Sequence, residues 1–321
     1  MVGADPQQHL PARAARHGIM TARVLVIGRE GQLARELARA RWPDGWLPTF
    51  AGRPELDLRF PDKAAAAVTA SAADLVVNAA AYTNVDQAES EPDIARLVNA
   101  AGPGAIAAAC GKIGATLVSI STDYIFDGTK AGPYLEEDPV NPIGAYGRSK
   151  AEGEALIRAA WAEHLILRTS WVFSPFGTNF VKTMLRLGSE RPQLRIVADQ
   201  RGCPTGARDL AGAVIGACTA VKSAKAGFGT YHVANSGATT WYDMTRAIFD
   251  TLAARGKQVP EIVPITTAEY PTKAARPANS VLDCGRMQST FGIALPPWQE
   301  ALEECVDELL KQRHGAGRGR G

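Results

Sequence analysis

A tyrosine and a lysine four residues apart are the side chains best suited to chemistry in this sequence. Tyr146 and Lys150 stand at i and i+4 of a predicted helix that begins near residue 145, so both lie on one helical face. An ammonium group beside a phenol favours the phenolate and lowers a pKa that is near 10 in free tyrosine. The pair therefore predicts a proton donor or acceptor for neutral pH. Taken alone, such a pair is more typical of an exposed helix surface.

A hydroxyl-rich segment precedes this pair. Residues 119–124 (SISTDY) close a predicted strand, and ligands of open α/β sheets bind at the carboxyl ends of strands. Thr122 is placed to hydrogen-bond the oxygen that Tyr146 protonates. A glycine loop, S-T-D at a strand end and Tyr-x-x-x-Lys rarely occur in this order by accident. Together they predict a catalytic triad of Thr122, Tyr146 and Lys150.

The glycine loop reads G-x-x-G-x-x-A over residues 28–34 (GREGQLA), between a predicted strand and a predicted helix. Gly28 allows a tight turn, Gly31 lets the backbone approach a diphosphate, and Ala34 lets the helix pack on the strand. The helix N-terminus supplies amide donors for the same anion. In this context the motif predicts a dinucleotide site.

The residue after the second predicted strand bears on the choice of cofactor. Arg53 suits a ribose 2′-phosphate, which favours NADPH while leaving NADH open. It is equally well explained as a solvated loop arginine. Asp57 and Leu58 follow it and are expected near the adenine.

Alternating strands and helices position these motifs. Strands are predicted at 23–27, 46–50, 75–78, 116–120 and 165–168, and helices at 32–41, 63–70, 93–112 and 145–163. This rhythm predicts an α/β fold, with a Rossmann-type doubly wound parallel sheet over residues 21–170.

A smaller C-terminal substrate-binding domain is predicted mainly over residues 171–313, with segments such as 194–221 free to return to the first domain. Helices are expected at 178–189, 208–221, 240–255 and 298–313, and strands at 194–197, 231–234 and 261–265. Residues 1–20 and 314–321 are expected to be a disordered extension and a disordered tail.

Composition narrows the class of protein. The 321 residues carry a net charge of +2, which does not indicate a nucleic-acid partner. No apolar run approaches the roughly 20 residues of a membrane helix, so no membrane association is predicted. The five cysteines are scattered, without a C-x-x-C pair, which favours a reducing, cytoplasmic location over a disulfide framework or a zinc site.

Beyond these motifs, the chain resembles the extended short-chain dehydrogenases and, within them, the dTDP-4-dehydrorhamnose reductase family. The resemblance covers about residues 22–313. Its segments are NAAAYTNVDQAE at 78–89, STDYIFDG at 121–128, AYGRSK at 145–150, RTSWVF at 168–173, NFVKTML at 179–185 and DQRGCPTGARDLA at 199–211. The first and the fourth are specific to the subfamily, whereas the others are shared more widely.

The resemblance implies roles for individual residues. The cofactor would be contacted at its diphosphate by Gly28, Gly31, Gln32 and Leu33, on the adenine side by Asp57 and Leu58, and along its length by Ala79, Ala81, Tyr82, Thr83, Asn99, Tyr146 and Lys150. The substrate would be contacted by Thr83, Thr122, Asp123, Tyr146, Trp171 and Arg276. Three of these have simpler explanations: Trp171 as a core residue, Asp123 as a turn cap and Arg276 as a surface side chain.

The reaction implied is reduction of the 4-keto group of dTDP-4-dehydro-6-deoxy-L-mannose to dTDP-L-rhamnose, by a monomer or homodimer. Tyr124 stands where a 4,6-dehydratase needs a carboxylate, which argues against dehydration. A related sugar-nucleotide reductase or epimerase stays open. So does a non-catalytic NADP-binding regulatory subunit that resembles the β-subunit of methionine adenosyltransferase.

Some members of the resembling family bridge a dimer with Mg²⁺ through acidic side chains. Glu36 and Glu308 match such positions, but Arg208 stands where that pattern has a glutamate. Since a cation there would repel a metal ion, no metal site is predicted.

Overall fold

A computed structural model describes residues 21–224 and 227–318, of which residues 313–318 are described by their backbone alone. The extension predicted to be disordered, residues 1–20, and positions 319–321 of the predicted tail lie outside the described residues.

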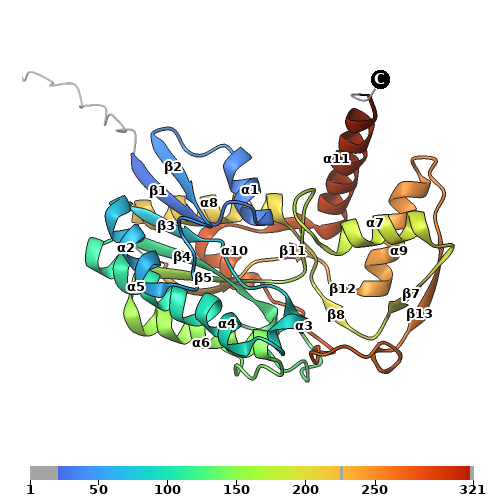
Figure 1. Cartoon of the computed structure of the whole chain (residues 1–321), viewed down its shortest axis with the longest axis horizontal. Coiled ribbons are helices and arrows are strands. Elements are labelled where there is room, and N and C mark those ends of the chain that lie inside the picture. Colours follow the sequence, from blue (N-terminus) through green and yellow to red (C-terminus); the bar gives the residue numbers. More distant parts are fainter. Residues whose placement is uncertain (1–20, 225–226, 319–321) are drawn as a thin grey trace, which may run out of the picture.

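Six parallel strands form the central sheet in the order β10-β5-β4-β3-β1-β2 (Figure 1). They are β1 (Ala22–Ile27), β2 (Trp46–Ala51), β3 (Leu75–Asn78), β4 (Thr116–Thr122), β5 (His164–Thr169) and β10 (Gly229–His232). The chain runs outward from β1 to β2 and then returns to the other side of β1 with β3. The predicted Rossmann-type sheet is therefore confirmed, with its ligand crevice expected where the strand order reverses.

Helices cover both faces of this sheet, and alternate residues of each strand point to opposite faces. One face packs against α1 (Gln32–Arg39), α8 (Ala207–Ala224) and α10 (Gly285–Phe291). The other face packs against α2 (Pro61–Ser71), α5 (Gly102–Ile113) and α6 (Ala145–Ala160). Burial on both faces explains why β1, β3 and the middle of β5 are mainly apolar.

The chain after residue 170 divides between this sheet and a second hydrophobic cluster. α8 and β10 return to the sheet, whereas α7 (Phe180–Glu190), α9 (Trp241–Ala253), α11 (Trp298–Arg318) and the parallel pair β7 (Gln193–Val197) and β13 (Glu261–Ile265) enclose the second cluster (Figure 1). Sequence patterns missed α10 and the short strands β6 (Val172–Phe173), β8 (Arg201–Gly202), β9 (Thr205–Gly206), β11 (Asn235–Ser236), β12 (Thr239–Thr240) and β14 (Leu295–Pro297).

The single helix predicted at 93–112 is observed as two α-helices joined by a π-helical turn, over residues 92–113. After a short helix α3 (Val85–Ala88), the run comprises α4 (Pro92–Arg96), a π-helical turn (Leu97–Ala101) and α5. A π-turn often marks a functional site. Here Gly153 of α6 packs on it so closely that a Cβ would lie 2.0 Å from the Asn99 carbonyl oxygen.

The last helix differs from its prediction. α11 continues to Arg318, through most of the segment expected to be a disordered tail. A helix already formed extends more easily than a new one starts, which explains why composition alone gave the wrong end point.

Candidate active site

Thr122, Tyr146 and Lys150 converge where β4 ends and α6 begins. Thr122 is the last residue of β4, and Tyr146 lies in the first turn of α6. Gly147 makes this approach close, since a Cβ there would lie 2.1 Å from the carbonyl oxygen of Tyr124. The Thr122 side chain lies close enough to the Tyr146 phenol to influence its pKa. The structure thus brings together the three residues predicted as a triad.

The charge state of the triad differs from the prediction. The Lys150 ammonium donates to the Ile120 carbonyl oxygen at 2.6 Å, so it is held by the strand and does not lower the pKa of the phenol. Burial raises the pKa of Tyr146 to about 12, and the neighbouring Thr122 side chain opposes that rise. The expected Lys-induced fall in the tyrosine pKa is therefore wrong for this structure. Tyr146 is a neutral phenol at pH 7, the form that donates a proton.

Asp123 lies buried behind Thr122. Its carboxylate accepts hydrogen bonds from Thr122 Oγ1 at 3.0 Å and from Ser170 Oγ at 2.9 Å, and Ser280 also bonds to it. Burial raises the pKa of Asp123 to about 6. The cap of the following turn is Thr122, whose hydroxyl accepts from the Tyr124 amide, so the simpler explanation of Asp123 as a turn cap does not hold.

Two aromatic residues of the site were not predicted from sequence. Tyr124 meets Tyr146 edge to face, with ring centroids 6.0 Å apart. Trp241 stacks on Trp171 with centroids 3.4 Å apart and an interplanar angle of 8°. Trp171 also adopts a φ of 47°, a strained conformation for a bulky residue. Trp171 is half-buried and packs against the second hydrophobic cluster, which agrees with the simpler explanation of a core residue.

Arg276 is bound within the fold. Its guanidinium pairs with Asp86 at 2.7 Å and donates to Thr272 Oγ1 at 2.6 Å and to the Ala274 carbonyl oxygen at 3.1 Å. These contacts exclude the explanation of a loose surface side chain. They fix the segment 272–276 against α3, the short helix that carries Asp86.

The phosphate loop fits a dinucleotide diphosphate. Gly28 has a φ of 120° and packs so closely that a Cβ would lie 3.3 Å from the Ala79 backbone. α1 begins after Gly31 with no side-chain cap and no acidic residue in its first turn, which leaves its amides available to an anion. The strand order also reverses here, between β1 and β3.

Gln32 and Leu33 turn their side chains away from this anion position. Gln32 donates to the Val172 carbonyl oxygen and accepts from Ser174 and Asn179, which ties the loop to the segment after β6. Leu33 is buried in the core beneath the sheet. Only their backbone amides are placed to face a diphosphate.

The adenosine side offers two arginines. Arg53 is exposed, and Arg29 pairs with Glu55 at 3.1 Å beside the same turn. Asp57 pairs with Arg59 at 2.6 Å. The Leu58 side chain is buried in the core, so any adenine contact there falls to its backbone.

The loop after β3 is fixed by hydrogen bonds to the side chain of Asn99, which lies in the π-helical turn. Asn99 accepts from the Tyr82 amide at 2.8 Å and donates to the Tyr82 carbonyl oxygen at 3.0 Å and to Ser149 Oγ at 3.0 Å. The Tyr82 hydroxyl donates to Glu91 at 2.8 Å. Asn99 therefore holds the Tyr82 backbone, in the loop that also carries the predicted cofactor-side residues Ala79, Ala81 and Thr83.

Glu36, Glu308 and Arg208 occupy the positions that correspond to the Mg²⁺ site of some family members. Glu36 is buried, and Arg39 bridges it to Glu308 at 2.7 and 2.6 Å. Arg208 pairs with Glu304 at 2.8 Å. Two guanidinium groups fill a place that a divalent cation would need, so these residues do not fit the metal. Among the described residues, no cluster of three or more His, Cys, Asp and Glu side chains could hold a metal ion.

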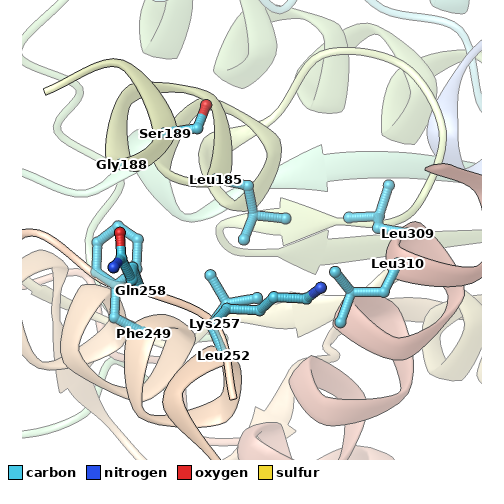
Figure 2. A pocket seen from close by; sticks show the side chains of 9 residues that line it. All are labelled: Leu185, Gly188, Ser189, Phe249, Leu252, Lys257, Gln258, Leu309 and Leu310. Carbon is cyan, nitrogen blue, oxygen red and sulfur yellow. The ribbon is translucent and has the colours of Figure 1, made fainter. Parts of the chain in front are cut away.

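A groove of about 370 Å³ lies elsewhere, between α7, α9 and α11 (Figure 2). Its walls are mainly apolar, and no member of the triad lines it. Leu185 points into it from α7, and Leu309 and Leu310 from α11. The groove belongs to the second hydrophobic cluster and not to the active site.

Together, the uncapped phosphate loop, the Thr-Tyr-Lys triad and the doubly wound sheet define a nicotinamide-dependent oxidoreductase of the short-chain dehydrogenase class. None of the described helices has the length and apolar character that crossing a membrane requires.

Comparison with known proteins narrows the class. A family model described as the RmlD substrate binding domain matches residues 22–311. A dTDP-4-dehydrorhamnose reductase of Sinorhizobium fredii is 44% identical over 291 residues, covering 90% of this chain and 98% of the relative. The Escherichia coli K12 protein of that name is 41% identical, with 89% and 98% covered. A Bacillus anthracis structure of that name, solved in complex with NADP, is 35% identical, covers 90% of this chain and 100% of its own, and superposes with a TM-score of 0.83. The chain belongs to the dTDP-4-dehydrorhamnose reductase family.

Proposed function

We propose that this protein reduces the 4-keto group of dTDP-4-dehydro-6-deoxy-L-mannose to the 4-hydroxyl of dTDP-L-rhamnose, with NADPH as reductant. The observation that carries the proposal is the convergence of Thr122, Tyr146 and Lys150 beside a loop fitted to a dinucleotide diphosphate. Relatives at 44% and 41% identity bear the name of this activity. An intact triad favours an enzyme over a regulatory subunit.

The chain's own residues support proton transfer in the reducing direction. When bound, NADPH supplies the hydride for the carbonyl carbon. Negative charge then grows on the keto oxygen, and the neutral phenol of Tyr146 donates its proton to that oxygen. The Thr122 hydroxyl, which donates to Asp123 in this structure, would turn its proton to the keto oxygen and supply a second hydrogen bond. Lys150, held by the Ile120 carbonyl, places a positive charge next to the pair and would grip the nicotinamide ribose.

Substrate binding is assigned to the side of the triad away from the phosphate loop. Asp123, held by Thr122 and Ser170, and the strained Trp171 would contact the sugar, with Thr83 at the cofactor boundary. Arg276 has several donors committed to Asp86, Thr272 and Ala274, and its remaining N–H groups would meet the nucleotide. The dTDP moiety would thus be recognised by the Arg276 guanidinium, whose orientation is fixed by its ion pair with Asp86.

The five cysteines are all free thiols, which supports activity in a reducing cytoplasm. We propose action as a monomer or homodimer. The arginines that pair with Glu36, Glu304 and Glu308 support action without a divalent cation.

The direct test supplies dTDP-4-dehydro-6-deoxy-L-mannose and NADPH to the purified chain and follows cofactor oxidation by absorbance, with product identified by NMR. We expect stoichiometric formation of dTDP-L-rhamnose. Cofactor binding without oxidation would support the regulatory-subunit alternative instead. Return of an epimerised keto-sugar without net oxidation would support the epimerase.

A further inference from the structure

Three successive residues at the end of β4 face α6. The Ile120 carbonyl accepts from Lys150 at 2.6 Å, Ser121 Oγ donates to Glu154 Oε1 at 2.6 Å, and Thr122 lies beside Tyr146. The middle contact lies between the two that involve catalytic side chains. It uses Glu154, which stands one helical turn after Lys150 and belongs to none of the groups placed at substrate or cofactor.

Glu154 forms a fully buried ion pair. Its carboxylate lies 2.7 Å from Arg168 on β5, and the two side chains are 2% and 3% exposed. Arg168 Nε donates to Oε1 of the same carboxylate at 3.0 Å, and Arg158 approaches from the surface at 3.2 Å. A buried pair contributes little net stability compared with apolar side chains of the same volume, so its presence beneath a catalytic centre calls for another explanation.

Lys150 lacks an ion-pair partner of its own. It is 5% exposed, its ammonium bonds to a neutral carbonyl, and no carboxylate lies within ion-pair distance of it among the described residues. The ionisable groups on the elements around it are those of α6 (Tyr146, Arg148, Glu152, Glu154 and Arg158), of the turn after β4 (Asp123 and Tyr124) and of β5 (His164 and Arg168). Of these, Glu154 is the charge that acts on it.

Burial and this carboxylate act in opposite directions on Lys150. Burial lowers the pKa of Lys150 to about 8, and the negative charge of Glu154 opposes the fall. Arg168 in turn keeps the pKa of Glu154 low despite its burial, so Glu154 is ionised at neutral pH. The charges therefore alternate from Arg168 through Glu154 to Lys150.

We propose that Glu154 is a positioning residue for the reduction: its carboxylate, fixed by Ser121 and Arg168, keeps Lys150 cationic and in register with Tyr146. This inference rests on the proposed function of the triad. It explains why an ion pair is buried beneath the triad, and why Ser121 lies between two residues that face catalytic side chains.

The test is the pH dependence of kcat in Glu154→Gln. Without the carboxylate, Lys150 loses its proton at a lower pH, so the alkaline limb should move down by about one pH unit, a tenfold loss at alkaline pH. Glu152→Gln is the matched control, because Glu152 lies on the same helix in an exposed pair with Arg96 at 2.6 Å. That control should keep the wild-type profile. A folded Glu154→Gln enzyme with the wild-type profile overturns the proposal.

Glu154→Gln leaves Arg168 buried without its partner and could therefore misfold. Two further variants test the proposal in that case. Glu154→Leu/Arg168→Met removes both charges together, and the same shift of the alkaline limb is expected. If neither folds, Ser121→Ala decides, because it keeps the ion pair and removes the link to β4. We expect it to lower kcat several-fold, and an unchanged kcat would overturn the proposal.

Failure of the proposed function is separable from failure of this inference. Wild-type protein without turnover contradicts the reductase assignment. The pH dependence of NADPH binding, measured by thermal shift in wild type and Glu154→Gln, still reports whether the carboxylate sustains the charge of Lys150. Identical binding profiles would sink the inference.

Discussion

The cofactor half and the substrate half of the active site are held by different kinds of interaction. The cofactor half depends on backbone geometry within one strand–turn–helix unit, with Gly28 at a φ of 120° and the uncapped start of α1. The substrate half depends on side-chain contacts between distant segments, such as Asp86 with Arg276 and Trp171 with Trp241. The first is sensitive to residue size and φ, and the second to the loss of one partner.

The largest effect is expected at the boundary between the two halves. Tyr146→Phe removes the proton donor but keeps the ring, so NADPH binding should persist while kcat falls by about a hundred- to ten-thousand-fold. Steady-state kinetics and cofactor titration measure the two separately. Tyr270→Phe, at an exposed tyrosine, is the control. Wild-type turnover in Tyr146→Phe would remove this residue from the mechanism.

The next prediction tests the backbone dependence of the cofactor half. Gly28→Val places a branched side chain at a positive φ and against the Ala79 backbone, so NADPH affinity should fall at least about tenfold. Gly132→Val, where nothing lies within 4 Å of the added Cβ, should bind normally. Fluorescence titration of NADPH compares them. Unchanged NADPH affinity in Gly28→Val would show that the cofactor half does not depend on the backbone geometry of the glycine loop.

A third prediction tests the substrate half. Asp86→Asn weakens the hold on Arg276 and on segment 272–276, so KM for the dTDP-sugar should rise about tenfold with little change in kcat or in NADPH affinity. Asp62→Asn, at an exposed residue of α2, serves as control. If NADPH affinity fell instead, the two halves would not be independent.

The smallest effect concerns cofactor choice. Arg53 is exposed, and an exposed charge pair contributes at most about 1 kcal/mol, so Arg53→Gln should weaken NADPH binding about fivefold and leave NADH binding unchanged. Arg191→Gln, an exposed arginine after α7, should change neither. An equal loss for both cofactors would show that Arg53 does not read the 2′-phosphate.

The fold was largely predictable because its signals are local. Apolar runs closed by glycine and helical spacing gave the first five strands of the sheet to within a few residues, and β3 and β13 at their observed limits. The sixth strand, β10, was predicted as a strand but not as a member of this sheet. Its pairing with β5 joins segments far apart in the chain, and no local pattern specifies such a partner.

By itself, the sequence determined the residue types and spacing of the site: a glycine loop before α1, S-T-D at the end of β4, and Tyr146 with Lys150 on one face of α6. These follow from short-range backbone geometry. Only the tertiary structure decided where the Lys150 ammonium points, that Tyr146 is a partly buried, neutral phenol, and that Arg276 and Trp171 each have a fixed partner. Such properties depend on desolvation and on contacts between segments that only the packed chain brings together.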